Sequence, residues 1–331
     1  MRFRSIAVTF LSLCAISSLG AQTTPISPSC PGGAVGSAAQ VTQDACQQAI
    51  DLFNYMRPQL GIAIAGGNAT LGQAGSLGGL PHFTIGLRGN VLQGSVPTIQ
   101  QPVATGASRR NPYPTKDTFL GLPAVDASIG LFKGLPFGVT NVGGVDVLLS
   151  ASYVPKINTS NVNVNPDTPL QIGYGARIGL LQESLLVPGV GVTILRRGLP
   201  KTTITGVVST TNDSVQVKDL DLQTTAWRVV ASKSLVLFTL AAGLGQDSYD
   251  ASTAINATVH APTRQTTSVT LAKQTMKRTN YFADLSMNLL LLKIIGEVGM
   301  VSGGTVDTYN VFDKKADASR YYGSVGIRLG F

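Results

Sequence analysis

Eight charged residues lie on the polar side of segments in which apolar and polar residues alternate. They are Arg88, Asp126, Asp146, Arg177, Asp284, Glu297, Arg320 and Arg328. Because side chains of a β-strand alternate between two faces, we expect these eight to share one interior. Buried charges must be paired or solvated. Two interpretations stay open: a satisfied ionic core that closes the interior, or the lining of a narrow polar route.

Catalysis is disfavoured by the small number of candidate bases. A hydrolase or transferase needs a general base close to a nucleophile or to an attacking water. The chain has 2 histidines, His82 and His260, and neither lies in an acidic cluster or at a recognisable spacing from a serine. No His, Cys and Asp spacing is typical of a metal site. We expect no enzyme activity, no metal and no cofactor.

The N-terminal leader indicates an exported chain, and export bears on the state of its cysteines. Arg2 and Arg4 precede an apolar stretch that ends at Gly20 and Ala21, which is the pattern of a secretory signal peptide over residues 1–21. Cys14 lies inside that stretch, and the bulky Leu13 before it disfavours a lipoprotein signal. In an oxidising compartment Cys30 and Cys46 are expected to form a disulfide, which would contribute about 3 kcal/mol.

Composition is unusual for a soluble protein. Charged residues make up 13% of the chain, and it contains 37 glycines. No segment after the leader has the roughly 18 uninterrupted apolar residues of a membrane helix. Loss of Arg2 and Arg4 lowers the formal net charge from +8 to +6 (8 − 2), with the remaining basic residues scattered. Nucleic acid is therefore not expected as a partner.

The segment after the leader has helical and glycine-rich parts. Residues 42–57 carry an apolar stripe at helical spacing, which Thr42 could cap and Pro58 is expected to end. Residues 60–67 could be a strand or stay outside a sheet. The Gly-rich residues 68–79 lack the ending of a phosphate-binding loop and are expected to thread a narrow space. Residues 22–80 are thus predicted to be an N-terminal plug or periplasmic segment with one helix.

Ten segments with period-two alternation follow from residue 81 onward. The predicted strands begin at Pro81 and continue at 122–133, 143–155, 168–181, 189–200, 217–231, 235–247, 277–291, 294–303 and 319–331. The strand around Trp227 is ambiguous, because Asp221 and Gln223 share its face. Residues 202–209 and 264–275 are also strand-like and are interpreted as extensions of the wall rather than as extra crossings.

Connection lengths alternate between long and short along these strands. The long ones are 95–121, 156–167, 201–216, 248–276 and 304–318, and the short ones are 134–142, 182–188, 232–234 and 292–293. Transmembrane β-barrels have short periplasmic turns and long extracellular loops. The pattern predicts an all-β fold, a transmembrane antiparallel β-barrel of about 10 strands over residues 81–331, with 12–14 strands left open.

The last residues, Arg320 to Phe331, place Tyr321, Val325, Ile327, Leu329 and Phe331 on one face. This resembles the closing strand of bacterial outer-membrane β-barrel proteins, whose terminal aromatic residue is a membrane-insertion signal. The resemblance implies a bacterial outer-membrane location, surrounding lipid and the barrel-assembly machinery as partners. We expect a monomer. An ordinary edge strand of a soluble β-sandwich is the alternative.

The N-terminal segment before the first wall strand is similar to the hatch of the long-chain fatty-acid outer-membrane transporter family. The similarity is architectural: that family usually has an Asn-Pro-Ala type motif where this chain has Gly66-Gly67-Asn68-Ala69-Thr70. It implies a porin-like channel or transporter for small molecules, hydrophobic ones included. A closed structural or adhesive barrel that acts through its extracellular loops is the alternative expectation.

Overall fold

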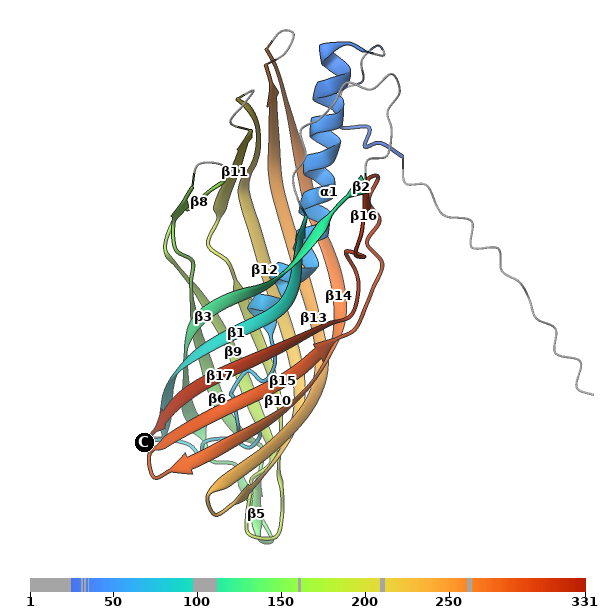
Figure 1. The fold of residues 1–331 in the computed structure, drawn as a ribbon. Coiled ribbons are helices and arrows are strands. Elements are labelled where there is room, and N and C mark those ends of the chain that lie inside the picture. The colour runs from blue at the N-terminus through green and yellow to red at the C-terminus, as the bar shows by residue number, and fades with distance from the viewer. Residues whose placement is uncertain are drawn as a thin grey trace, which may run out of the picture.

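A computed structural model describes residues 25–30, 32, 34, 36–97, 112–159, 162–208, 212–260 and 264–331. The signal peptide predicted at residues 1–21 lies outside these ranges. Within them the chain forms a closed antiparallel barrel with a helix at one end (Figure 1).

Ten strands form the wall, and each pairs with its neighbours along the chain. The strands are β1 (Phe83–Pro97), β3 (Thr115–Phe132), β6 (Gly144–Tyr153), β9 (Leu170–Leu181), β10 (Gly189–Gly198), β12 (Asp213–Leu235), β13 (Phe238–Val259), β14 (Gln265–Leu289), β15 (Leu292–Val301) and β17 (Arg320–Gly330). Pairing of β1 with β17, from Thr84 opposite Gly330 to Leu92 opposite Tyr322, closes the ring. All ten predicted strands are present, and the fold class is confirmed.

Shorter strands extend the wall. β11 (Thr202–Val208) pairs with β12, and β8 (Val162–Pro166) and β7 (Ile157–Asn158) follow in the same sheet. β4 (Leu135–Phe137) and β5 (Thr140–Val142) form a hairpin, and β2 (Pro112–Tyr113) pairs with β16 (Val311–Phe312). The predicted extension at residues 202–209 is therefore confirmed over Thr202–Val208, and residue 209 lies outside the described ranges. The extension at 264–275 is confirmed from Gln265 onward as part of β14.

The expected long loop at 248–276 is largely wrong. β13 continues to Val259 and β14 starts at Gln265, so most of this range is paired strand. On this extension of β13 the inner face is apolar, because Ala257 and Val259 pack against Val41 and Ala45 of α1. The alternation is therefore inverted relative to that of a strand whose apolar face meets lipid.

The wall is apolar outside and polar inside. On β17, Val325 and Ile327 point outward, with exposed fractions of 68% and 50%, whereas the flanking residues Ser324 and Arg328 are buried. The carboxyl end is fixed to the first strand, since Phe331 and Phe83 exchange backbone hydrogen bonds of 3.0 and 3.1 Å and their rings stack. This outer surface suits lipid.

The helix α1 (Ala38–Ala65) is longer than expected at both ends. Ser37, not Thr42, caps it, because the Ser37 hydroxyl accepts from the Gln40 amide at 3.2 Å. Pro58 lies inside the helix and does not end it, so residues 60–65 are helical. Of the two interpretations of residues 60–67, the strand is wrong and the position outside the sheet is confirmed. Residues 61–65 are buried on every side, and burial within the barrel outweighs the hydrogen bond that a proline removes.

The helix occupies the lumen at the end where the strands are longest (Figure 1). It contacts β12, β13 and β14 on one side and β1 and β3 on the other. From Gly66 the chain continues without helix or strand to His82, where β1 begins beside the carboxyl terminus. Within the described ranges no helix combines the length and apolar content that a membrane crossing requires.

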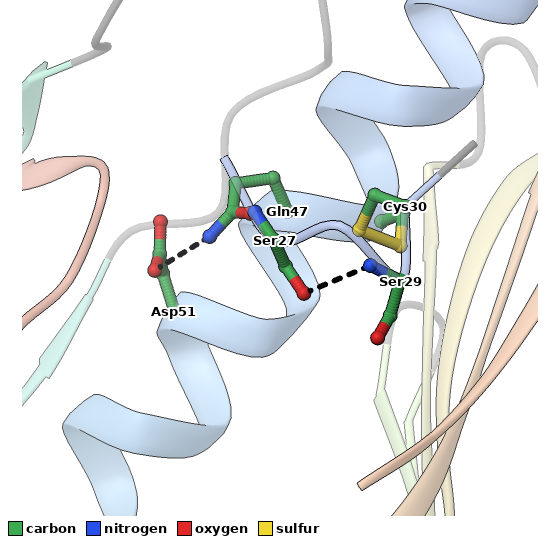
Figure 2. The surroundings of a disulfide bond; sticks show 6 residues. Ser27, Ser29, Cys30, Gln47 and Asp51 are labelled. Carbon is green, nitrogen blue, oxygen red and sulfur yellow. Dashed lines mark hydrogen bonds between the residues drawn. A yellow bond between two sulfur atoms is a disulfide. The ribbon is translucent and has the colours of Figure 1, made fainter. Parts of the chain in front are cut away.

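The Cys30–Cys46 disulfide joins the segment before α1 to the third turn of the helix (Figure 2), with Cα atoms 5.8 Å apart. Nearby, the Ser27 amide donates to Gln47 Oε1 at 2.6 Å, and Gln47 donates to Asp51 at 3.0 Å. The bridge predicted from sequence is thus present, and it fixes the chain to the outer end of the helix.

We predict that neither Cys30 nor Cys46 reacts with an alkylating reagent in the denatured, non-reduced mature protein. Both should react after reduction, because the bridge is then open. Mass spectrometry of the alkylated peptides measures this. A third modification, at Cys14, would show that the leader is retained, and alkylation of Cys30 or Cys46 before reduction would contradict the bridge.

Candidate functional site

The stretch between helix and wall, residues 66–80, is here called the plug segment. Its backbone passes very close to the wall. Gly67 has φ +60°, and a Cβ atom there would lie 1.6 Å from Glu297 Oε1. Gly72 has φ +69°, and its Cβ would lie 2.9 Å from Ser286 Oγ. Glycine is therefore required at both positions, as expected for a chain that threads a narrow space.

Two facing carboxyl groups bind the amide groups of the plug segment. Asp284 on β14 and Glu297 on β15 are paired across the two strands. Asn68 donates its backbone N–H to Glu297 at 2.6 Å and its side-chain N–H to Asp284 at 2.8 Å. Asp284 also accepts from the Gly72 amide at 3.0 Å. One asparagine thus binds both carboxyl groups, while the other oxygen of Asp284, Oδ1, is buried without a hydrogen-bond partner among the described residues.

Four arginines of the wall donate to oxygen atoms of the plug segment. Arg228 donates to the Gly67 carbonyl at 3.1 Å, and Arg88 donates to the Asn68 carbonyl at 3.2 Å. Arg177 reaches the Thr70 hydroxyl at 2.8 Å, and Arg328 reaches the Leu71 carbonyl at 2.8 Å.

Three of these arginines also pair with an aspartate on the adjacent wall strand. The N···O distances are 3.1 Å for Arg88–Asp126, 2.7 Å for Arg177–Asp146 and 2.5 Å for Arg228–Asp247. Arg197 reaches across from β10 to Asp126 at 3.1 Å. Arg328 forms no ion pair within the described part of the chain, and it differs from the others in this respect.

The lower part of the plug segment is bound in the same way. The Ala74 amide donates to Ser232 Oγ at 3.1 Å, and the Leu77 amide donates to both carboxylate oxygens of Asp146 at 3.1 Å. Contacts therefore come from seven wall strands: β1, β6, β9, β12, β14, β15 and β17. These side chains form a polar girdle that surrounds the plug segment.

The structure places all eight charged residues predicted from sequence on the inner side of the wall. Six of them bind the plug segment directly: Arg88, Asp146, Arg177, Asp284, Glu297 and Arg328. Asp126 acts one step away, through Arg88 and Arg197. Arg320 lies nearer the helix and donates to Ser95 Oγ at 3.3 Å.

Sequence reasoning missed Asn68, Arg197, Arg228 and Asp247. Arg228 was hidden by the ambiguous parity around Trp227. Asp221 and Gln223 do lie on the outer face with Trp227, so polar residues on that face masked the inward position of Arg228. Arg197 could have been predicted from Ile194, which points outward. Residues an odd number of positions from Ile194 in the same strand point inward, and Arg197 is three positions away.

The two histidines lie apart from the girdle's charged groups. The His82 ring contacts the Gly79 carbonyl at 3.0 Å, at the end of the plug segment. His260 lies at the tip of the long strands, with Nδ1 3.6 Å from Asp213 Oδ1. Among the residues that the structure describes, no group of three or more His, Cys, Asp and Glu side chains could hold a metal ion.

The helix carries two acidic residues with different surroundings. Asp51 accepts from the amides of Tyr309 and Asn310 at 3.1 and 2.9 Å, which fastens the loop before β17 to α1. Burial raises the pKa of Asp51, while those hydrogen bonds act in the opposite direction. Burial alone raises the pKa of Asp44 to about 6.

Comparison with known proteins gives only weak similarity. No family profile and no curated protein sequence matches the chain. Among solved structures, outer-membrane expressed OmpT of Vibrio cholerae is 8% identical, with 76% of this chain and 97% of that chain covered and a TM-score of 0.18. A mutant of TodX, a monoaromatic hydrocarbon channel, is 7% identical, with 75% and 89% covered and a TM-score of 0.22.

TM-scores at this level carry no argument, so the class follows from the chain's own wall. That wall is closed, antiparallel, apolar outside and charged inside, and it has an even number of strands. This is the fold of an outer-membrane β-barrel protein.

We predict that Gly67→Ala loosens the plug segment. The new methyl group would displace Glu297 and require a positive φ, at a cost of about 1–3 kcal/mol. Hydrogen exchange of residues 66–77 should therefore become about tenfold faster or more, as measured by mass spectrometry. Gly296→Ala is the matched control, because a Cβ there has no neighbour within 4 Å. Equal exchange in both variants would contradict the close approach.

We predict that Asp44→Asn stabilises the protein at pH 7.5 but not at pH 4. The folded-state pKa of about 6 exceeds the ordinary value of 3.8, so stability falls as pH rises from about 4 to about 6. Thermal unfolding in detergent measures the difference, with exposed Asp167→Asn as control. A higher melting temperature for Asp44→Asn at pH 4 alone would contradict the assignment.

Proposed function

We propose that the protein is a bacterial outer-membrane channel or transporter for small molecules, closed in this state by the plug segment. The observation that carries the proposal is the girdle: side chains from seven strands bind one irregular segment in the lumen. Ten strands lie between the filled eight-stranded barrels and the open porins of sixteen or more. A removable segment is therefore the natural barrier.

The barrel wall does not need the plug segment for its own integrity. Its strands are joined by a complete antiparallel ladder, from β1 through to the closing β1–β17 pair. The plug segment is held by side chains, and hydrogen bonds of this kind exchange with water at a modest net cost of about 0.5–1.5 kcal/mol each. Release of the plug segment can thus open the lumen while the wall stays folded.

The surroundings that we propose follow from the same architecture. The apolar outer band is covered by outer-membrane lipid after insertion by the barrel-assembly machinery, and the protein acts as a monomer. We propose no enzymatic activity, since neither His82 nor His260 is placed beside a nucleophile in the contacts described above. A barrel that stays closed and binds partners through its long strand extensions, β7, β8, β11 and the tips of β12–β14, is the second candidate.

Solute flux into liposomes that contain the mature protein tests this proposal. Asn68→Ala removes the side-chain N–H that Asp284 accepts and leaves the backbone N–H to Glu297 in place. Hydrogen bonds to charged groups contribute about 1.5–3 kcal/mol. We expect about tenfold to hundredfold more open plug and a corresponding rise in flux. Asn256→Ala, on the extension of β13, should leave the flux unchanged.

Heat-modifiable migration on a denaturing gel should accompany each flux measurement, because it shows that the barrel is folded. Absence of flux from the wild type and from Asn68→Ala, both folded, would reject the channel and favour the closed barrel. A rise in flux for Asn256→Ala as large as for Asn68→Ala would instead show that the plug segment is not the barrier.

A further inference from the structure

A cavity of about 340 Å³ lies below the plug segment, at the barrel end with the short turns. Gly72, Gln73 and Gly75 of the plug segment line one side of it. Lys293 and Arg328 line another side, and the turn residue Leu290, which is fully exposed, brings the cavity to the surface. A solute that enters from this end meets these groups first.

Lys293 and Arg328 are neighbours without a counter-ion. They are directly opposite each other on β15 and β17. Arg328 is only 9% exposed, and its one hydrogen bond within the described residues goes to the Leu71 carbonyl. The side-chain ammonium of Lys293 forms no hydrogen bond or ion pair with the described residues. The other inward arginines of this half of the barrel, Arg88, Arg177, Arg197 and Arg228, all have an aspartate partner.

The acidic groups that line the cavity form no ion pair with Lys293 or Arg328. Glu183 acts on Lys293 only from beyond ion-pair distance, and it accepts hydrogen bonds from the Ser234 amide and from Ser232 Oγ. The main-chain oxygen of Phe331 accepts from the Phe83 amide at 3.1 Å. Neither group is within ion-pair distance of Lys293 or Arg328. A poorly solvated cation gains from an anionic partner, and here the cavity leaves space for one.

We propose that this cavity binds a small oxyanion, a carboxylate or a phosphate group, between Lys293 and Arg328. An ammonium and a planar guanidinium side by side suit such a group, because the guanidinium can donate two parallel hydrogen bonds. The conclusion that the transported solute carries an oxyanion rests on the proposed channel function. The conclusion that the cavity binds an oxyanion does not depend on it.

Arg328 links the site to the plug segment. The same guanidinium that faces the cavity holds the Leu71 carbonyl at 2.8 Å. An oxyanion competes with that carbonyl for the N–H groups of Arg328, and a charged acceptor forms the stronger hydrogen bond. Occupation of the site therefore weakens one contact of the girdle.

Line broadening of inorganic phosphate and acetate in NMR spectra, measured with the full mature protein in detergent, tests the site. Lys293→Gln should weaken binding by about tenfold, with hydrogen exchange of residues 66–77 unchanged, since Lys293 does not contact the plug segment. Arg328→Gln should weaken binding and also speed exchange, and Arg328→Lys should restore part of the binding. Lys133→Gln is the control, because Lys133 is exposed at the same end but does not line the cavity.

Binding of both probes supports a general oxyanion site, and binding of phosphate alone supports a site for phosphate-bearing solutes. Unchanged binding in Lys293→Gln, or equal loss in Lys133→Gln, would overturn the proposal. Oxyanion binding without solute flux in any variant would reject the proposed channel function and support the oxyanion site. Solute flux without oxyanion binding would reject the oxyanion site and support the channel function.

Discussion

An irregular backbone inside a membrane barrel must have all its polar groups satisfied by the protein. Residues 66–80 form neither helix nor strand, so they have no regular ladder of backbone hydrogen bonds, although the Gln73 amide donates to the Thr70 carbonyl at 3.1 Å. The wall supplies the missing partners, with carboxyl groups where the plug segment presents N–H groups and arginines where it presents oxygen atoms. The inner charges of this barrel are therefore explained by the segment that they bind, and their positions follow its path. Gly67 and Gly72 complete the arrangement, since any larger residue would displace the wall groups.

The helix extends the same constraint to the outer end of the lumen. Its lower part is buried on all sides, and Gly61 permits this because a Cβ atom there would lie 2.5 Å from the Tyr249 ring. Its upper part is fixed by the disulfide and, through Asp51, to the loop residues Tyr309 and Asn310. Loop, helix and plug segment are thus one continuous set of contacts. A displacement of that loop would act on the helix directly and on the plug segment through it.

The ten wall strands were predictable because lipid requires an apolar residue at every second position. The extension of β14 within residues 264–275 was recognised as strand, but that of β13 was not, because its apolar face turns inward against α1 instead of outward to lipid. The end of the helix was predicted wrongly at Pro58. The rule that proline ends a helix does not take into account that the residues after Pro58 are buried on all sides, which stabilises the helix beyond it. Inward charges were found at Arg88 and Arg177, where the polar and apolar faces are distinct, and missed at Arg228, where polar residues also occupy the outer face. That Asn68 joins two strands could not be read from sequence, since nothing local links it to Asp284.

Loss of the plug segment would affect the two halves of the girdle unequally. Arg88, Arg177 and Arg228 would keep their aspartate partners, because those ion pairs lie between adjacent wall strands. Asp284 and Glu297 would lose the Asn68 donors, and Arg328 would lose its one hydrogen-bond acceptor. The cost of opening is thus concentrated on β14, β15 and β17, where water or a solute must replace the plug segment. A sealed structural core has no need of such a division, whereas a barrier that leaves and returns needs a wall that stays largely paired without it.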